Sequence, residues 1–499
     1  MKKIYKLSYG FILVAVCLMT ISCEDWLDVN PSTQLDRDGL FSTEAGYRDA
    51  ITGTYSQMTS TSLYGREMTF GALDVLAGYY NPTQSGTTTY YKFFYQYPYK
   101  LDNAGKDDAC VAVVDKMWSD TYGAIANLNS LLETIDDNKT VFSGENYQVM
   151  KGEAIGLRAF LHFDLLRMFG PSYTVDPAAN AIPYVDTLSS RVSPLLTVEQ
   201  AADRIISELQ RSLMLMEKDP IISGEQPSIV LSSAVSTETM PGYHNRKYRF
   251  NYYAAAAALA RVYLWKGDKV NALKYAKQVI AVQASRFPWV EDANLTSIST
   301  ANATNKDRTF TTEHIFGLNV RALEGTVPLH FSPVGMGSST GLLLYSSRYI
   351  KNQIYESNTL DPRNQYLFLA DGSNFFPTKL YQDAVTSSWF KNQVPLIRIS
   401  EMYYIAAESE PNVEDGLVWL NTVRQVRKLS VLDAATVPNA ETLDVEIQKE
   451  FQKEFICEGQ LWFYYKRKNL ESLPYSFSFS DTKLYVFDLP ADETAFGGR

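Results

Sequence analysis

The chain has few of the residues that most often carry metal or redox chemistry. Its 499 residues include only four cysteines and four histidines. Cys17 and Cys23 lie near the N-terminus, whereas Cys110 and Cys457 are far apart in the sequence, which gives neither a disulfide framework nor a zinc site. We predict no metal and no cofactor. We expect Cys110 and Cys457 to be buried free thiols, with a single bridge between them as the alternative.

Signatures of common catalytic sites are also missing. The sequence contains no GxSxG nucleophile elbow, no HExxH zinc motif and no P-loop. No two of the histidines are spaced as metal ligands are, and His162, within a helical pattern, is expected to be packed or hydrogen-bonded. We predict that the protein is not an enzyme, although its 56 acidic residues leave a carboxylate pair for glycoside hydrolysis open.

Basic residues are in the minority. The formal net charge is −10, whereas a protein that binds nucleic acid presents a basic face to the phosphates. We therefore predict that nucleic acid is not a partner. After residue 22 the sequence also lacks any run of about 18 uninterrupted apolar residues, the length that indicates a membrane-spanning helix.

The N-terminus has the organisation of an export signal. Lys2, Lys3 and Lys6 precede an apolar stretch of about a dozen residues, which is shorter than the roughly 20 that span a bilayer. The stretch ends at Ser22 and Cys23, a junction that resembles the processing site of a bacterial lipoprotein. We expect residues 1–22 to be removed and Cys23 to carry acyl chains that anchor the protein. A plain secretory signal with an incidental cysteine is the alternative.

The rest of the chain is dominated by helical patterns. Apolar residues at spacings of three and four positions predict amphipathic helices. These cover Val111–Ile135, Glu153–Phe169, Thr197–Met216 and Val445–Lys468. Gly170 followed by Pro171 ends the second of them, and Thr197 is a candidate N-cap for the third.

Two segments have the form of tetratricopeptide helix pairs. In Asn251–Val282 an alanine-rich helix, a Lys-Gly-Asp turn and a second helix follow one another, and Ala254–Ala258 predict close contact with a neighbouring helix. Ile397–Glu410 and Val413–Lys428 repeat this form. The patterns predict a mainly α-helical fold with little β structure, in which helix pairs form a scaffold.

Long segments rich in Ser, Thr, Gly, Asn and Pro separate the helices. They cover Tyr79–Asp107, Asp219–Lys247, Arg286–Thr312 and Leu323–Ser347. Loops of this length are uncommon unless they are functional or disordered, and their aromatic residues argue against disorder. We interpret them as binding loops on the helical scaffold.

Aromatic residues are concentrated in the first of these loops, where nine lie between Tyr79 and Tyr99. Sugars offer C–H faces that stack on aromatic rings, and hydroxyls that bond to polar side chains. The candidate ligand-binding residues are Asp74, Tyr79, Tyr80, Asn81, Tyr90, Tyr91 and Trp289. For each aromatic residue, packing of its loop on the helices is the alternative.

Charged residues on the helices are expected to be structural. Arg398 and Glu401 are predicted to form a local ion pair, and Glu454 and Glu458 are predicted to lie on a solvated helical face.

Seven segments in order resemble the SusD/RagB family of outer-membrane lipoproteins. They are DWLDVNPSTQ with the following FSTEAGYRDAITGTYSQM, EAIGLRAFLHFDLLRMFG, AAAALARVYLWKGD, PLIRISEMYYIAAESE, LNTVRQVR, EFQKEFICEGQLWFYYKRKNL and YVFDLPADETAFGGR. The resemblance covers nearly the whole chain after residue 22. Leu461 and Tyr464 depart from the family pattern, which usually has Arg and an acidic residue at these positions.

The resemblance implies a surface-exposed nutrient-binding lipoprotein (SusD-like). Such proteins bind an oligosaccharide, or sometimes a peptide, and pass it uncleaved to a SusC-type TonB-dependent transporter. We expect residues 23–225 and 226–499 to be the N-terminal and C-terminal segments of one compact α-helical fold. Residue types do not distinguish a glycan from a peptide ligand, so both stay open, with a secreted glycoside hydrolase as the third alternative.

Overall fold

The computed structural model describes residues 37–80, 90–96, 108–189, 191–223, 245–331, 346–474 and 482–497. Its helices are α3 (Glu44–Met58), α4 (Ala72–Leu76), α5 (Tyr90–Gln96), α6 (Asp108–Thr134), α7 (Asn146–Phe169), α8 (Val198–Leu215), α9 (Pro220–Ser223), α10 (Tyr252–Lys266), α11 (Lys269–Ile280), α12 (Gln283–Arg286), α13 (Asp292–Ser297), α14 (Leu323–Phe331), α15 (Arg348–Ile354), α16 (Pro362–Tyr366), α17 (Ile399–Ser409), α18 (Val413–Val426), α19 (Ala440–Glu454), α20 (Gln460–Arg467) and α21 (Ala491–Phe496). No helix within these ranges is both long and apolar enough to cross a bilayer.

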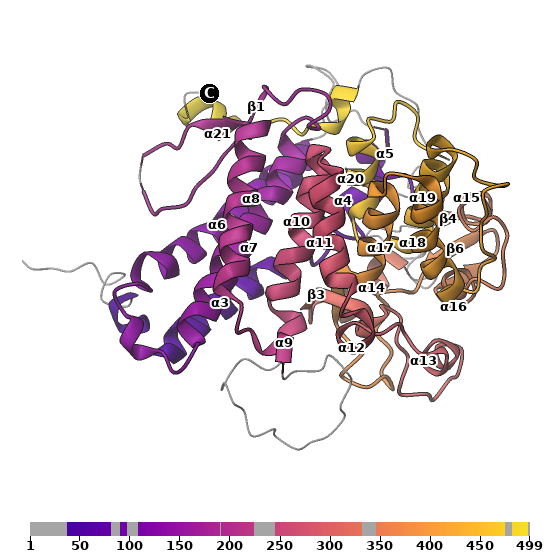
Figure 1. Ribbon diagram of the computed structural model, residues 1–499, viewed down its shortest axis with the longest axis horizontal. Helices are drawn as coiled ribbons and strands as arrows, with labels where there is room; N and C mark the ends of the chain where they lie inside the picture. Colours follow the sequence, from indigo (N-terminus) through magenta and orange to yellow (C-terminus); the bar gives the residue numbers. More distant parts are fainter. Residues whose placement is uncertain are drawn as a thin grey trace, which may run out of the picture.

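The longer helices pack one on the next. Helix α7 contacts α8, α8 contacts α10, α10 contacts α11, α11 contacts α17, and α17 contacts α18 and α19. Figure 1 shows this series running from the centre of the molecule to its right side. The pairs α10–α11 and α17–α18 confirm the two helix pairs predicted from the sequence, and the mainly α-helical fold is confirmed.

Local residues fix the ends of the pair α10–α11. Asn251 Oδ1 accepts the N–H of Ala254 at 2.9 Å, and Asp268 Oδ1 accepts the N–H of Asn271 at 3.0 Å, so a side chain caps the start of each helix. Gly267 between the helices has a φ of 83°, in the left-handed region that glycine adopts without strain. Ala254–Ala258 are fully buried, as their small size predicted.

Helices α7 and α8 approach each other closely because α7 carries glycine at the contact. A Cβ at Gly156 would lie 2.3 Å from Ser212 Oγ of α8 and 2.4 Å from the Phe250 ring. Ser212 Oγ donates to the backbone oxygen of Gly152 at 2.6 Å. Thr197 begins α8 with a reciprocal capping box to Gln200, which confirms it as the N-cap.

The strands form three small antiparallel sheets at the edges of the helical stack. They are β1 (Asn180–Pro183) with β2 (Leu195–Thr197), β3 (His314–Asn319) with β7 (Gln393–Arg398), and β6 (Asn374–Pro377) between β4 (Ser346–Ser347) and β5 (Phe368–Asp371). In the most buried of them, Leu318 of β3 lies opposite Val394 of β7.

The final helical stretch differs from the sequence expectation. It is broken into α19 and α20, because Cys457 and Gly459 between them adopt left-handed φ values of 65° and 68°. A Cβ at Gly459 would lie 2.1 Å from the backbone oxygen of Met68. This close approach brings α20 against α4, so a helix from the start of the chain lies among the C-terminal helices (Figure 1).

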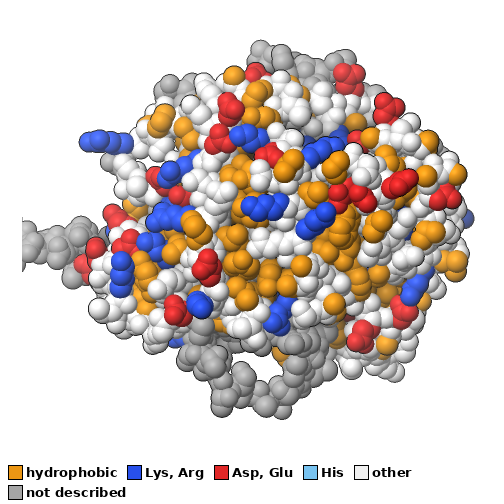
Figure 2. Space-filling view, in the orientation of Figure 1, with side chains coloured by type: hydrophobic (Ala, Val, Ile, Leu, Met, Phe, Trp, Pro, Cys, Tyr) orange, Lys and Arg blue, Asp and Glu red, His pale blue; other side chains and the backbone are white. Residues whose placement is uncertain are grey.

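The surface seen in Figure 2 carries no large area of one charge sign. Lys, Arg, Asp and Glu side chains alternate with apolar ones over this face. Exposed apolar side chains include Val270 of α11, Val418 of α18 and Val445 of α19. Within the described residues both cysteines, Cys110 and Cys457, are buried free thiols, as predicted.

Candidate functional site

Two of the predicted binding tyrosines hold α4 against the C-terminal helices. Tyr79 donates its hydroxyl to the backbone oxygen of Gln452 at 2.7 Å. Tyr80 donates to Asp74 Oδ2 at 3.1 Å. Both rings are fully buried. The bond from Tyr79 joins the segment after α4 to α19, and the Tyr80 hydroxyl also lies 3.4 Å from Cys457 Sγ in the turn after α19.

Asp74 stabilises the left-handed turn between α19 and α20. Its Oδ2 accepts the N–H of Cys457 at 2.6 Å, and its Oδ1 accepts the N–H of Gly459 at 3.0 Å. Burial raises the pKa of Asp74 to about 8, although the two N–H groups and Tyr80 act in the opposite direction. A polar side chain that the sequence placed in a binding loop therefore caps an internal turn.

Tyr90 and Tyr91, at the start of α5, share one buried carboxylate. Both hydroxyls donate to Glu67, Tyr90 at 2.7 Å and Tyr91 at 3.2 Å. Glu67 also accepts a bond from Arg66 Nε at 2.7 Å. Tyr91 is fully buried, whereas Tyr90 keeps part of its ring exposed.

Trp289 lies on other elements. Its ring centroid is 5.3 Å from that of Tyr403 on α17, and the guanidinium of Arg427 lies 5.6 Å from the ring centroid. Trp289 is half-buried, so one part of the ring is open to solvent and the other belongs to the packing of α17.

The seven candidate ligand residues stay predictions, and the structure adds where six of them lie. Asp74, Tyr79, Tyr80 and Tyr91 are fully buried with hydrogen bonds inside the protein, so in this arrangement they offer no face to a ligand. Packing of the loop on the helices, the alternative reading, accounts for these four. Tyr90 and Trp289 are half-buried; Asn81, like Cys23, lies outside the described residues.

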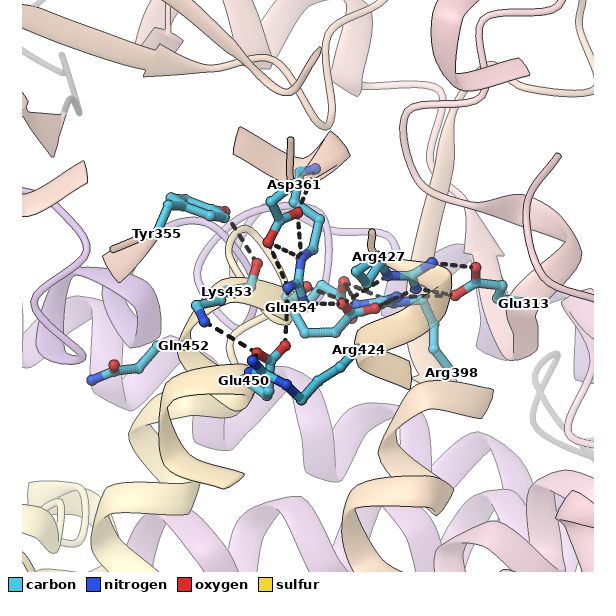
Figure 3. Close-up of polar contacts among 12 residues, drawn as sticks. Glu313, Tyr355, Asp361, Arg398, Arg424, Arg427, Glu450, Gln452, Lys453 and Glu454 are labelled. Carbon is cyan, nitrogen blue, oxygen red and sulfur yellow. Dashed lines mark hydrogen bonds and ion pairs between the residues drawn. The ribbon is translucent and has the colours of Figure 1, made fainter. Parts of the chain in front are cut away.

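A network of buried charges joins α17, α18 and α19 to the segments that carry Glu313 and Arg363 (Figure 3). Glu454 is its centre and accepts bonds from Arg427 at 2.7 Å, from Arg398 at 2.5 Å and from Arg363 at 2.7 Å. Burial alone would raise the pKa of Glu454, but the three guanidiniums hold it well below its usual range.

Further carboxylates complete the pairing of these guanidiniums. Glu313 binds Arg427 through both oxygens, at 2.9 and 2.6 Å. Asp361 and Glu450 bind Arg363 at 2.7 and 2.9 Å. These side chains are essentially inaccessible, so the network fixes the positions of chain segments and has no surface for a substrate.

This network corrects two sequence-based predictions. Glu454 and Glu458 were predicted to be solvated, but both are buried, and each pairs with the buried guanidinium of Arg398. The predicted local pair of Arg398 with Glu401 was wrong as well. Arg398 binds Glu454 and Glu458, while Glu401 binds Arg261 of α10 at 2.6 Å.

An open groove of about 430 Å³ lies at the edge of the stack where β1 and α21 meet, at the top of Figure 1. Half-buried Tyr122 and Val185 form its inner part, and the exposed side chains of Arg191, Asp492 and Phe496 form its rim. The side chain of Phe496 is 81% exposed. The volume falls within the range of small-molecule sites.

His162 holds the wall of this groove in place. Its Nε2 accepts the N–H of Val185 at 3.0 Å, so its Nδ1 carries the proton and donates to the backbone oxygen of Arg158 at 2.9 Å. The Tyr184 ring stacks on the imidazole at 3.9 Å. Burial lowers the pKa of His162 to about 3, which keeps the ring neutral. His162 is therefore packed and hydrogen-bonded, as predicted.

The groove combines the groups that recognise a sugar. Tyr122 and Phe496 supply aromatic surface, while Arg191, Asp492 and the hydroxyl of Thr187 supply hydrogen-bonding groups. Sequence reasoning missed these residues because residues near 190 and near 495 come together only in the folded chain. No spacing or motif in the sequence indicates that contact.

The described residues contain no group of three His, Cys, Asp or Glu side chains placed to hold a metal ion.

The chain belongs to the SusD/RagB family. Residues 25–264 match the family described as "Starch-binding associating with outer membrane", and residues 345–482 match the SusD family. The family resemblance inferred from the sequence motifs is confirmed.

Solved structures share the fold over most of the chain. A SusD superfamily protein from Bacteroides vulgatus has a TM-score of 0.67 at 21% identity, covering 92% of this chain and 98% of that structure. A SusD superfamily protein from Bacteroides thetaiotaomicron has a TM-score of 0.66 at 19% identity, covering 91% and 98%. A SusD-like carbohydrate binding protein from Bacteroides vulgatus has a TM-score of 0.64 at 15% identity, covering 91% and 97%.

Curated relatives match part of the chain. SusD-like protein P2 of Formosa agariphila is 24% identical over 314 residues, which are 62% of this chain and 53% of that protein. SusD-like protein P25 of the same organism is 25% identical over 177 residues, 34% of this chain and 32% of that protein. The chain therefore spans about half or less of the length of these relatives.

Proposed function

We propose that this protein is a cell-surface lipoprotein that binds an oligosaccharide and delivers it, uncleaved, to a SusC-type TonB-dependent outer-membrane transporter. The match of residues 25–264 to a starch-binding family associated with the outer membrane carries the proposal. Acylation of Cys23 would tether the helical fold to the membrane surface.

We place the oligosaccharide in the groove between the segment after β1 and α21. The exposed Phe496 ring can stack on a sugar face, while Arg191 and Asp492 can bond to its hydroxyls. The inner surface made by Tyr122 and Val185 is partly apolar and is held rigidly through His162. A rigid inner surface with an exposed polar rim suits a ligand that is captured and then released.

A binding screen tests this proposal. A soluble form that begins at Glu24 is titrated against polysaccharides, oligosaccharides and peptides by calorimetry. We expect the protein to bind one class of glycan selectively. Phe496→Ala or Arg191→Ala should weaken the affinity for that glycan by about tenfold, because each variant loses one aromatic contact or one charge-assisted bond. Both side chains are exposed, so we expect stability to change by less than about 0.5 kcal/mol.

Matched variants separate the groove from the residues predicted by sequence. Val445→Ala serves as the control, because it also truncates an exposed apolar side chain but lies on α19, and it should leave binding unchanged. Tyr90→Phe and Trp289→Ala alter the two half-buried candidates. If these two variants bind the glycan more weakly while the groove variants bind it as wild type does, the site lies where the sequence analysis predicted it. If the screen finds only a peptide ligand, the proposed function changes from glycan uptake to peptide uptake.

The partner and the anchor need separate tests. Wild-type protein extracted from outer membranes in detergent should co-purify with a large TonB-dependent transporter. A Cys23→Ala form should lose its membrane anchor and appear in the soluble fraction. Retention of the Cys23→Ala form in the outer membrane would contradict the lipoprotein assignment without affecting the binding result.

A further inference from the structure

A small cavity of about 40 Å³ lies where α7, α10, α17 and α20 meet. Arg167 of α7, Arg261 and Trp265 of α10, and Glu401 of α17 contribute to its lining. This volume holds one to three water-sized particles, since a water needs about 10–15 Å³ measured in this way. It is far smaller than a sugar site, so any occupant is a water or a small ion.

Three hydrogen-bond donors of the lining residues lack an acceptor among the described residues. They are Arg167 Nε, Arg261 Nη1 and Trp265 Nε1. The three residues are 3%, 6% and 3% exposed, so bulk water does not satisfy these atoms. An unmade bond at a buried donor costs about 1–3 kcal/mol, more for a charged group. Three such atoms around one cavity therefore require an acceptor from outside the chain.

The acceptors inside the protein are already engaged by other nitrogens of the same arginines. Arg261 Nε and Nη2 bind both oxygens of Glu401, at 2.6 and 2.5 Å. Arg167 binds Asp164, and its Nη1 donates to Gln460 Oε1 at 3.1 Å. Glu401, the carboxylate that lines the cavity, is thus paired with Arg261. Arg167 and Arg261 each keep one side-chain nitrogen without an acceptor.

We propose that this cavity binds a small monovalent anion of halide size, held by Arg167 Nε, Arg261 Nη1 and Trp265 Nε1. An anion accepts from all three donors and has no hydrogen of its own to place, whereas a water must also donate two. Bonds from guanidinium to an anion are stronger than bonds to a neutral acceptor. Burial lowers the pKa of Arg167 and the charge of Arg261 lowers it further, while Asp164 opposes both, so added negative charge is favourable there.

The site would couple helices that are distant in sequence. Arg167 ends α7, while Arg261 and Trp265 lie on the second half of α10. An anion that bonds to all three links the two helices at the point where α20 packs over them. It stabilises the folded state by mass action, because the unfolded chain has no such arrangement of donors, and the stabilisation grows with the logarithm of the anion concentration once this exceeds the dissociation constant. Glycan binding in the groove does not depend on it.

Halide-dependent unfolding tests the proposal. The mature protein is unfolded thermally in sodium chloride, sodium bromide or sodium methanesulfonate at equal ionic strength, with methanesulfonate as the anion too bulky for the cavity. We expect the midpoint to rise with chloride or bromide, following the logarithm of the halide concentration once this exceeds the dissociation constant, and to stay unchanged in methanesulfonate. Trp265→Phe removes the indole N–H but keeps an aromatic ring, and it should raise the apparent dissociation constant by about tenfold.

Trp419→Phe is the matched control, because Trp419 Nε1 donates to Glu410 on the outer side of α17–α18, away from the cavity. It should keep the wild-type halide dependence. Equal midpoints in the three salts, or the same halide dependence in Trp265→Phe as in wild type, would overturn the proposal in favour of water. If Trp265→Phe fails to fold, anomalous scattering from bromide-soaked wild-type crystals decides: a peak bonded to the three nitrogens supports the site, and water density there overturns it.

Discussion

The protein contains two clusters of buried arginine that differ in one respect. In the network around Glu454, every side-chain nitrogen of Arg363, Arg398 and Arg427 donates to an acceptor within the chain. At the junction of α7 and α10, Arg167 and Arg261 each keep one nitrogen without such an acceptor. Both clusters are buried and contain carboxylates, so burial of charge alone does not distinguish a structural site from a binding site.

The difference lies in the balance of donors and acceptors. A network whose donors are all satisfied fixes the surrounding segments, and binding anything further would break existing bonds. A cluster with spare donors can accept a ligand without losing a bond. In this comparison, the unpaired donors mark the second cluster, and not the first, as a candidate for ligand binding.

The largest effect should follow from breaking the satisfied network. Glu454→Gln removes the charge that three guanidiniums share and leaves them buried with too few acceptors. We expect a loss of about 3–5 kcal/mol in the free energy of unfolding, measured by urea denaturation. Glu414→Gln, an exposed acid in the first turn of α18, is the control and should change stability by less than about 0.5 kcal/mol. A comparable loss in both would mean that the network is not special.

A somewhat smaller loss of stability is expected from a change in the turn between α19 and α20. Gly459→Ala places a Cβ at a left-handed φ of 68° and 2.1 Å from the Met68 backbone oxygen. The conformational strain alone costs about 1–3 kcal/mol, and the contact with backbone adds to it. Gly267→Ala, at a φ of 83° but with open space around it, isolates the conformational part. Urea midpoints of the two variants should differ, with Gly459→Ala the less stable.

The smallest predicted effect is a pH dependence of stability that arises from His162, the histidine that supports the groove. The pKa of His162 is about 3 in the folded protein and about 6.5 in an unfolded chain. Between these values the unfolded state binds a proton that the folded state does not, so stability falls as the pH falls, by about 1.4 kcal/mol per pH unit. The lowered pKa of Glu454 acts in the same direction, but only below about pH 4.5.

Unfolding curves at pH 7, 6 and 5 test this assignment in wild type and His162→Gln. His314 and His330 also have pKa values lowered by burial, so the wild-type slope includes their contributions. The variant should lose about one proton's share of the slope between pH 6 and pH 5. An unchanged slope would show that His162 is protonated in the folded protein and that its bonds to Val185 and Arg158 are assigned wrongly.

The scaffold could be predicted from the sequence, because local signals specify it. The capping residues Thr197 and Asn251 and the glycine at 267 act on neighbouring backbone, and the buried alanines of α10 reveal a close helix contact. Each of these features acts within a few residues. The sequence therefore located α8, α10 and α11 within one or two residues of their ends.

The groove that we propose as the site could not be predicted in the same way, because its residues come from distant segments. The aromatic richness after α4 was a real signal, but most of its described rings pack inside the protein, with Tyr79 bonded to Gln452 of α19 and Tyr91 bonded to Glu67. Glu454 has the polar sequence context of a surface helix, but it is buried among arginines that come from other segments of the chain. Phe496 gains significance only from its position beside Arg191.

The hydrogen bonds that the backbone N–H groups of Cys457 and Gly459 donate to Asp74 impose an order on the folding of this protein. They join residues that lie 383 and 385 positions apart in the chain. On a ribosome, the segment that carries Asp74 is finished long before its partners exist, so its carboxylate and the tyrosines beside it wait in solvent until nearly the last helix is synthesised. Contacts of such long sequence separation slow folding. The chain thus completes its core late, after the segment that carries Cys457 and Gly459 has been made.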